Sequence, residues 1–390
     1  MSIFFKLLLL ITLFVAVACA NEFSKLPDGF NDMQSEFDAY AEEQNQEFED
    51  YKKALEKEYA DYKKSLEKFW DNPKLSTKKE WISYSKDKTT RSDIDFEKNT
   101  IKVEVVASSP AEARKKLSKQ LAFAVEADTK EVIKKDTLQH KVAQLSKKSE
   151  TPHATVDKKP IISTVIFGTK PTQKKVRSFV QKNVKNIKQR TTKKGVIYSI
   201  KVPLPKNTTL KLAKKYENEV LQQSKRFQMP IPLIFAIMQT ESYFNPFAKS
   251  HIPAYGLMQI VPWTAGKDTY QFIYKQKLEP SATYLYNSKN NIEMGSAYLH
   301  ILYYRYLRPI KDPQTRLYCT IAAYNTGAGN IAWAFTHHYN VKTAAKKINT
   351  MSSEEVYNHL LRNLKYDEPK YYLKRVRKRM NAFNQAYANN

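Results

Sequence analysis

One uncharged stretch constrains this chain more than any other. In a protein in which 27% of residues are charged, Ile231–Met238 carries no charge. Two prolines at its start suit the first turn of a helix, where a missing backbone N–H costs nothing, and apolar residues follow at helical spacing. Asn245-Pro246 should end that helix. The sequence therefore predicts a buried helix with Glu241 in its last turn.

Glu241 is the first acidic residue after the apolar run. Burial and the negative end of the helix dipole would both raise the pKa of a carboxyl group in that position. A carboxylic acid that stays protonated near neutral pH can act as a general acid. The alternative is an ordinary helix-end glutamate, solvated or paired with Lys249. The residues of this stretch leave both interpretations open.

Three motifs bear on this choice. They read Glu-Ser-x-Phe-Asn from Glu241, Gly-Leu-Met-Gln from Gly256 and Ala-Tyr-Asn-x-Gly from Ala323. In this order and at these intervals they resemble the lytic transglycosylases with a goose-lysozyme-like domain, over residues 206–390. The resemblance implies an all-helical, lysozyme-like catalytic domain. Apolar spacing predicts its helices at Leu210–Phe227, Pro232–Tyr243, Ile292–Tyr306, Leu317–Ala323 and Tyr371–Ala386.

The resemblance implies cleavage of the β-1,4 bond between N-acetylmuramic acid and N-acetylglucosamine in peptidoglycan glycan strands. Glu241 would protonate the leaving oxygen while the substrate's own acetamido oxygen stabilises the sugar cation. Glu241 would then take the proton of the muramic C6 hydroxyl, which attacks the anomeric carbon and gives a 1,6-anhydro end. No cofactor or metal is implied.

The same resemblance implies a set of substrate-binding residues, which are Ser242, Ser250, Met258, Gln259, Tyr324, Asn325 and Tyr372. Ser250 and Gln259 would hold the acetamido group and sugar hydroxyls. Tyr372 would orient the acetamido oxygen, with a helix-packing tyrosine as the alternative.

The other four positions would shape the site. Ser242 would steady Glu241, or would only cap the local backbone. Met258 would pack under a sugar ring, or would belong to the core. Tyr324 and Asn325 would close the floor of the cleft.

Asp268 is the residue on which a different reaction would depend. It is the first acidic residue after Glu241. Goose-type lysozymes, which hydrolyse the same bond, use acidic residues on the downstream loop, and two carboxylates are what a hydrolase needs. A hydrolytic muramidase is therefore the second interpretation. A non-catalytic peptidoglycan-binding lipoprotein is the third.

The N-terminus has the form of a secretion signal over residues 1–19, with Lys6 followed by an apolar run and small residues. The run is too short to span a bilayer. Ala18-Cys19-Ala20 fits an ordinary signal peptidase, whereas Val15–Cys19 resembles a bacterial lipoprotein box. We favour lipidation of Cys19. This predicts a protein anchored in the membrane by lipid on the periplasmic side of the outer membrane; a soluble secreted or periplasmic protein is the alternative.

Three eleven-residue repeats follow, EFDAYAEEQNQ, EFEDYKKALEK and EYADYKKSLEK, over residues 36–68. Eleven residues in three turns keep the aromatic stripe on one face of a helix, so a long helix is predicted over residues 30–75. The stripe could dock cell-wall protein partners. We favour the simpler interpretation that it packs on its own domain.

Residues 76–203 are predicted to form a mixed α+β domain, which makes the fold class of the chain α+β. Strands are expected at Ile101–Val105, Ile161–Phe167 and Val196–Val202. Ser109-Pro110-Ala-Glu112 reads as a capping box that opens a helix. The basic stretches Lys134–Lys159 and Lys170–Lys194 are compatible with helix, hairpin or mobile loop. This region resembles, more weakly, the N-terminal part of the membrane-bound lytic murein transglycosylase C family.

The net charge and the cysteine content indicate which binding partners, disulfides and metal sites to expect. The net charge is +26. Nucleic acid is not the expected partner, because the chain has a secretion signal and no nucleic-acid-binding motif. Anionic cell-wall polymer or an anionic membrane surface fits the positive charge better. The two cysteines are Cys19 and Cys319, so lipidation of Cys19 would leave no disulfide. Histidines and cysteines lack metal-ligand spacing.

Overall fold

The computed structural model describes residues 50–145, 158, 160–250 and 254–388. The chain divides into two compact units, Met1–Glu56 and Lys57–Asn390, and the features described below belong to the second. The predicted signal, Cys19 and the first aromatic repeat lie outside the described residues. Across the described residues, no helix combines the length and the apolar character needed to cross a membrane.

The helix of the third repeat ends earlier than predicted. Residues 57–66 are helical, and the chain then turns instead of continuing to residue 75. Trp70 is buried there and its indole N–H donates to the Lys88 carbonyl at 2.8 Å. Leu66 and Trp70 pack against Ile197 of the sheet. Pro73, which disfavours helix at the residue before it, explains why the helix cannot resume. These residues of the repeat pack on their own domain.

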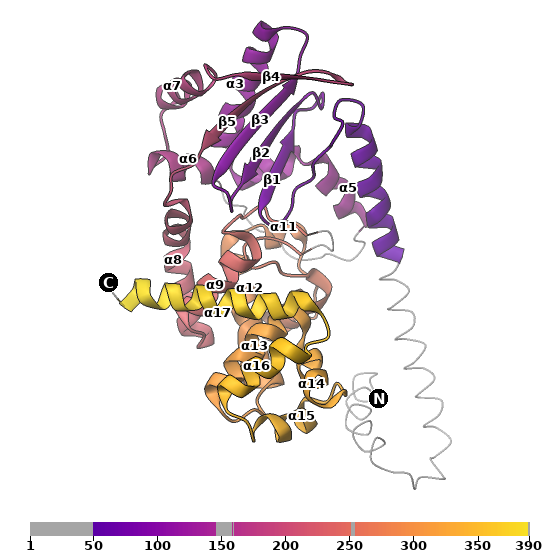
Figure 1. Cartoon of the computed structure of the whole chain (residues 1–390), viewed down its shortest axis with the longest axis vertical. Helices are drawn as coiled ribbons and strands as arrows, with labels where there is room; N and C mark the ends of the chain where they lie inside the picture. The colour runs from indigo at the N-terminus through magenta and orange to yellow at the C-terminus, as the bar shows by residue number, and fades with distance from the viewer. Residues whose placement is uncertain (1–49, 146–157, 159, 251–253, 389–390) are drawn as a thin grey trace. The chain divides into compact units, whose positions relative to one another are not determined.

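A five-stranded antiparallel sheet forms the centre of the α+β part (Figure 1). Its order is β1-β2-β3-β5-β4, with bounds β1 Glu80–Tyr84, β2 Thr90–Asp95, β3 Thr100–Val106, β4 Lys188–Thr192 and β5 Gly195–Pro203. Ile101 pairs with Val202 and Val103 with Ile200, which places fully buried side chains side by side in the core. The predicted strands at 101–105 and 196–202 are confirmed as β3 and β5.

Helix α3 (Pro110–Glu126) packs on β2 and β3. Ser109 caps it by accepting from the Glu112 N–H, as predicted, and Pro110 occupies the first turn. The return bond differs, because the Glu112 carboxylate accepts from the Ser108 N–H at 3.0 Å. Leu117 and Leu121 are buried without exposed area. The cap and the inward face of this helix were therefore readable from sequence.

Ile161–Phe167 is a helix, α6, and the strand predicted there was wrong. The Thr164 hydroxyl donates to the Pro160 carbonyl at 2.7 Å, one helical turn back, and Gly168 ends the helix with φ 78°. A short apolar run does not distinguish a buried strand from a buried helix. Of the basic stretches, Lys134–Lys159 contains α5 Thr137–Leu145, and Lys170–Lys194 contains α7 Gln173–Asn183 and strand β4. A further helix, α4 Thr129–Lys135, ends at the start of the first stretch.

Among the described residues beyond Leu204, the regular secondary structure is helical, apart from isolated bridges around Tyr255. The elements are α8 Thr208–Phe227, α9 Ile231–Ser242, η1 Pro262–Gly266, α10 Lys267–Tyr274, α11 Ala282–Leu285, α12 Ser288–Ile301, η2 Leu302–Tyr306, α13 Pro313–Thr326, α14 Ala328–Thr336, α15 Val341–Ile348, α16 Ser353–Asn363 and α17 Asp367–Ala388. All five predicted helices are present. The one predicted over Ile292–Tyr306 continues from α12 into the π-helical turn η2.

The C-terminal helix α17 lies across α9 (Figure 1). Phe383 of α17 stacks on Phe235 of α9, with ring centroids 5.2 Å apart. The sheet domain joins the same core, because Trp81 of β1 packs 4.7 Å from Phe247, just beyond α9. Helix α9 is thus held on one side by α17, and the segment that follows it is held by the sheet domain. The α+β class predicted for the chain agrees with this arrangement.

Candidate active site

Glu241 lies at the end of the buried helix α9, as the sequence predicts. Helix α9 stops at Ser242 because Tyr243 and Phe244 both adopt left-handed backbone angles, with φ 52° and 62°. Asn245 then bends the chain into a turn by bonding its carboxamide oxygen to the Phe247 N–H at 3.0 Å. Glu241 is only 4% exposed. A carboxyl group is thus held in the core at a helix end.

Ser242 ties that helix end to the Gly-Leu-Met-Gln turn. Its hydroxyl lies 2.7 Å from the Leu257 carbonyl and 3.0 Å from the Met238 carbonyl. The bond to Leu257 crosses from α9 to the turn, which a purely local cap would not do. The position of Glu241 is therefore coupled to the turn that carries Gln259.

Asn291 of α12 holds the same turn, and the sequence analysis did not single it out. Its amide nitrogen donates to the Tyr255 carbonyl at 2.7 Å and its oxygen accepts from the Met258 N–H at 2.8 Å. Gly256 has φ 75°, and a Cβ there would lie 2.4 Å from the Asn291 amide nitrogen. Only glycine fits such a position without strain. The glycine at position 256 was the sequence feature that marked this turn, whereas Asn291, which holds the turn, lies far along the chain.

Gln259 and Met258 differ in what they offer a ligand. Gln259 is buried, and its amide nitrogen donates to the Gly256 carbonyl at 3.1 Å. Its amide oxygen has no hydrogen-bond partner among the described residues. Met258 is fully buried, and its sulfur packs where a side chain at Gly295 would stand. Gln259 therefore has a free acceptor, whereas Met258 lies in the core.

Tyr324, on α13, lies beside this turn. Its hydroxyl donates to the Met258 carbonyl at 2.8 Å, and its ring meets Tyr298 edge-on at 5.4 Å. Burial and the negative charge of Glu241 raise the pKa of Tyr324 well above its ordinary value. The next residue, Asn325, is half-buried. The two residues thus stand where α13 approaches the Glu241 region.

Tyr372, on α17, is 1% exposed. Its hydroxyl forms no hydrogen bond of normal geometry with any described residue. Burial and the charge of Glu241 nevertheless raise its pKa well above the ordinary value, so the hydroxyl lies close to that carboxylate. Neighbouring Tyr371 is 58% exposed, so the register of α17 directs residue 372 inward. Buried hydroxyls without partners are rare, and each calls for an explanation.

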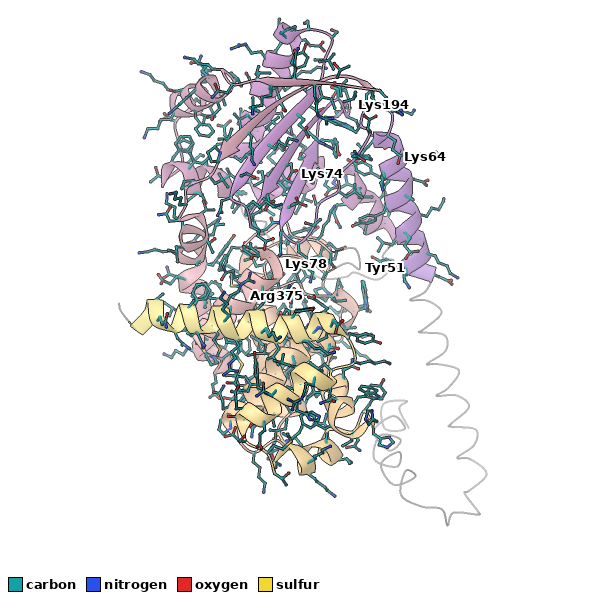
Figure 2. The ribbon with its side chains drawn as sticks, viewed as in Figure 1. Tyr51, Lys64, Lys74, Lys78, Lys194 and Arg375 are labelled. Atoms are coloured by element: carbon teal, nitrogen blue, oxygen red, sulfur yellow. The ribbon has the colours of Figure 1, made fainter. Side chains whose placement is uncertain are left out.

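Lys78 is the unexpected member of the site. Its ammonium group donates to Glu241 Oε2 at 3.0 Å, from the segment just before β1 (Figure 2). The Asn245 side-chain amide donates to the Lys78 carbonyl at 3.3 Å and so holds the same segment. In the sequence nothing separates Lys78 from the many other lysines. Only folding brings it to Glu241.

Lys249, the partner considered for Glu241 from sequence, instead pairs with Asp136 at 2.9 Å. The lysine is 5% exposed. Burial alone would lower the pKa of Lys249, yet the charge and hydrogen bond of Asp136 and the nearby tyrosine hydroxyls together raise it. Burial alone would raise the pKa of Asp136, yet the charge and hydrogen bond of Lys249, together with a backbone N–H and a nearby histidine, lower it. This pair joins the sheet domain to the residue before Ser250, whose hydroxyl accepts from the Ala254 N–H at 3.1 Å.

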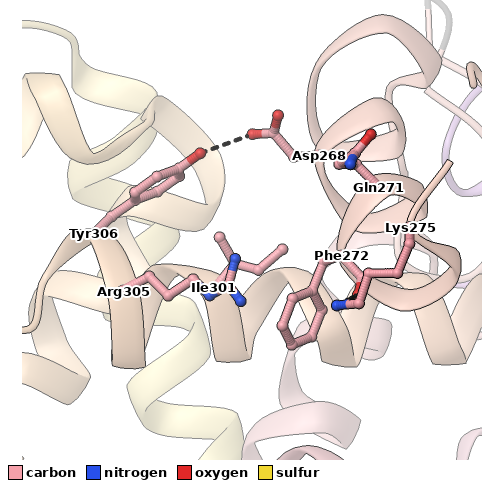
Figure 3. A pocket seen from close by; sticks show the side chains of 7 residues that line it. All are labelled: Asp268, Gln271, Phe272, Lys275, Ile301, Arg305 and Tyr306. Atoms are coloured by element: carbon pink, nitrogen blue, oxygen red, sulfur yellow. Dashed lines mark hydrogen bonds between the residues drawn. The ribbon is translucent and has the colours of Figure 1, made fainter. Parts of the chain in front are cut away.

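Asp268 lies on α10, in a cavity of about 330 Å³ (Figure 3). The residues lining the cavity are Asp268, Gln271, Phe272, Lys275, Ile301, Arg305 and Tyr306. The Tyr306 hydroxyl donates to the Asp268 carboxylate at 3.0 Å. Burial and Asp268 raise the pKa of Tyr306 to about 12. Glu241 is not among the residues that line this cavity.

Possible metal ligands and the thiol of Cys319 are the other reactive groups to place in the described part of the chain. No cluster of three histidine, cysteine, aspartate or glutamate side chains that could hold a metal ion occurs there. Cys319 is buried, and burial raises the pKa of its thiol far above the ordinary value. A buried thiol of this kind is inert.

Residues 219–347 match the family model of the Transglycosylase SLT domain. The matched segment contains Glu241, Gln259 and Tyr324, whereas Tyr372 falls beyond it. Because the segment is a third of the chain, it identifies a domain and leaves the remainder of the chain without an assignment.

Several solved structures are similar to this chain. The 70-kDa soluble lytic transglycosylase from Escherichia coli is 24% identical with a TM-score of 0.33, covering 44% of this chain and 24% of its own. A complex of the 70-kDa soluble lytic transglycosylase with bulgecin A is 23% identical with a TM-score of 0.35, covering 46% and 25%. An inactive mutant of the lytic transglycosylase Slt from Pseudomonas aeruginosa is 18% identical with a TM-score of 0.38, covering 72% and 38%. The chain thus spans well under half the length of these proteins.

Proposed function

We propose that this protein is a peptidoglycan lytic transglycosylase in which Glu241 serves as both acid and base. The observation that carries the proposal is the burial of Glu241 at the end of α9, inside the segment that matches the SLT domain. Two further buried groups accompany it: the Gln259 amide oxygen, which has no hydrogen-bond partner among the described residues, and the Tyr372 hydroxyl, which lies close to Glu241. A role in binding the substrate would explain both.

The reaction transfers one proton through Glu241. In the protonated form Glu241 gives its proton to the glycosidic oxygen as the bond from that oxygen to the muramic anomeric carbon breaks. The substrate's acetamido oxygen stabilises the resulting cation. The Glu241 carboxylate then removes the C6 hydroxyl proton, and the new bond from O6 to the anomeric carbon closes the 1,6-anhydro ring. No water is consumed, and Glu241 ends protonated for the next cycle.

The surrounding residues receive roles that fit their contacts. The Tyr372 hydroxyl, close to Glu241, would orient the acetamido oxygen. The free Gln259 oxygen would accept from a sugar hydroxyl or the acetamido N–H. Ser242 positions the helix end through Leu257. Ser250, Met258, Tyr324 and Asn325 are proposed to line or support the sugar-binding cleft.

Hydrolysis by a second carboxylate is the competing reaction. Asp268 would have to reach the site, yet its carboxylate accepts from Tyr306 in a cavity whose lining lacks Glu241. This observation favours the single-carboxylate mechanism. A purely binding role remains the third outcome of the experiment that follows.

Mass spectrometry of digested sacculi tests the proposal. Wild-type protein should release muropeptides with 1,6-anhydromuramic ends, each lighter by one water than its hydrolysed counterpart. Reducing ends in their place would identify a muramidase. Binding to sacculi without soluble products would identify a wall-binding protein.

We further propose that Cys19 is lipidated and that the protein is anchored on the periplasmic side of the outer membrane, with a relationship to the membrane-bound lytic murein transglycosylase C family. The lipoprotein-like Val15–Cys19 segment supports this assignment. Cys19→Ala should abolish incorporation of a radiolabelled fatty acid. A variant that is labelled as strongly as wild type would contradict the assignment.

A further inference from the structure

The Lys78 ammonium group is bonded to one of the two carboxyl oxygens of the proposed acid, Glu241. It donates to Glu241 Oε2 at 3.0 Å, and the Lys78 side chain is 40% exposed whereas that of Glu241 is 5% exposed. The lysine thus reaches from the surface to the buried carboxyl. Oε2 can give a proton to a glycosidic oxygen only when this cation is no longer bonded to it. The pair therefore has to open before Oε2 can act as the acid.

The main chain of Lys78 is held, so the movable part is its side chain. The Lys78 carbonyl accepts from Asn245 at 3.3 Å. The next residue, Lys79, donates to Glu97 at 2.9 Å and lies over the Tyr243 ring at 4.9 Å. A lysine side chain is a flexible four-carbon stem with a compact charge at its end. The ammonium group can therefore leave Glu241 while the segment stays in place.

Other basic side chains around the end of α9 already have partners. Lys249 pairs with Asp136, Arg379 bonds the Tyr243 hydroxyl, and Arg375 pairs with Glu368. Of these cations, Lys78 is the one bonded to Glu241 itself. A negatively charged group arriving with the substrate would compete with Glu241 for this lysine.

We propose that Lys78 is a latch that the substrate displaces, a specificity residue that favours glycans carrying carboxylates. The inference rests on the proposed function, and it concerns which glycan the site accepts. A muramyl residue carries either a free lactyl carboxylate or the carboxylates of its stem peptide. Either would draw the ammonium group from Glu241 and free the carboxyl oxygen. A neutral N-acetylglucosamine oligomer offers no such group, so it must open the ion pair without compensation.

The kinetic test compares Lys78→Met with wild type on three substrates: peptide-bearing glycan strands, peptide-free strands with lactyl carboxylates, and neutral N-acetylglucosamine oligomers. Opening a partly exposed ion pair weakens the binding of a substrate that gives nothing in return by up to about fivefold. Lys78→Met should therefore raise kcat/KM on the neutral oligomer by up to about fivefold, mainly through KM, and should not raise it on the anionic strands. Whichever anionic strand loses more activity identifies the carboxylate that Lys78 binds.

Two variants serve as controls. Lys78→Arg keeps the cation and should preserve the wild-type preference for anionic strands. Lys74→Met removes a lysine from the same segment with similar exposure, 44%, whose partner is Asp93 at 2.6 Å (Figure 2). It should leave kcat/KM unchanged on all three substrates. A Lys78→Met variant that slows all substrates equally would refute the latch and leave only a structural role.

A binding experiment separates the latch from the catalytic proposal. In a Glu241→Gln background Lys78 has lost its internal anion, so binding of peptide-free strands measured by calorimetry should weaken about fivefold or more when Lys78→Met is added. Binding of the neutral oligomer should stay unchanged. Equal binding of the anionic strands by both proteins would refute the latch. Wild-type protein that binds strands but releases no products would instead refute the proposed function, and this binding comparison would still decide the role of Lys78.

Discussion

We expect Tyr372→Phe to leave the protein as stable as wild type, or more stable, while it slows cleavage. The Tyr372 hydroxyl is buried and lacks a hydrogen bond of normal geometry to any described residue. An unsatisfied buried polar group costs about 1–3 kcal/mol. Phenylalanine keeps the ring and removes that cost, so the free energy of unfolding should stay constant or rise by about 1 kcal/mol.

Activity should move the opposite way. If the hydroxyl orients the acetamido oxygen, its loss removes one hydrogen bond in the transition state, or about 1.4–2.8 kcal/mol and ~10–100-fold in kcat/KM. Urea unfolding measures the first quantity, and the rate of muropeptide release from sacculi measures the second. Tyr318→Phe is the matched control, since Tyr318 is also buried and packs against Tyr357 at 5.1 Å. A Tyr372→Phe variant that is less stable by more than about 1 kcal/mol, yet fully active, would show that Tyr372 is a packing residue.

Two further predictions concern the framework of the site. Asp136→Asn leaves the Lys249 ammonium group buried without its anion and should lower the free energy of unfolding by about 3–5 kcal/mol, and adding Lys249→Met should recover most of the loss in urea unfolding. Because the pKa of Asp136 is lowered from its ordinary 3.8, the pair stabilises the fold fully above that value, and this stabilisation is lost as the pH falls through the folded pKa. The double variant should lack this part of the loss of stability in acid. A double variant whose stability falls in acid as much as that of wild type would count against the pair. Gly256→Ala should lower the free energy of unfolding by at least about 2 kcal/mol through backbone strain and overpacking. The loss should exceed that of Gly327→Ala, because Gly327 also has a positive φ but a Cβ there would meet no atom within 4 Å. Equal losses of stability in thermal unfolding would contradict this reasoning.

The parts of the site that were predictable are those set by local sequence. The uncharged run, its prolines and Asn245-Pro246 were enough to predict α9 with Glu241 in its last turn. Ser109 and Glu112 predicted the start of α3 for the same reason, since a cap depends on neighbours three residues apart. The glycine of the Gly-Leu-Met-Gln turn was also visible, because its backbone angle demands it.

The parts that were missed depend on contacts between distant segments. Lys78 reaches Glu241 across 163 positions of sequence, and Lys249 reaches Asp136 across 113. No local pattern marks either lysine among the 65 basic residues. Ile161–Phe167 failed for a different reason, because a short apolar run is compatible with both a buried strand and a buried helix until its neighbours are known.

Digestion of sacculi in water labelled with oxygen-18 tests the central claim most directly, using wild type, Glu241→Gln and Asp268→Asn. The account predicts unlabelled anhydro products from wild type and from Asp268→Asn. It also predicts a loss of at least ~10²–10⁴-fold in rate for a folded Glu241→Gln variant, the usual worth of general acid–base catalysis. Labelled reducing ends that disappear in Asp268→Asn, or a Glu241→Gln protein that digests sacculi at the wild-type rate, would contradict it.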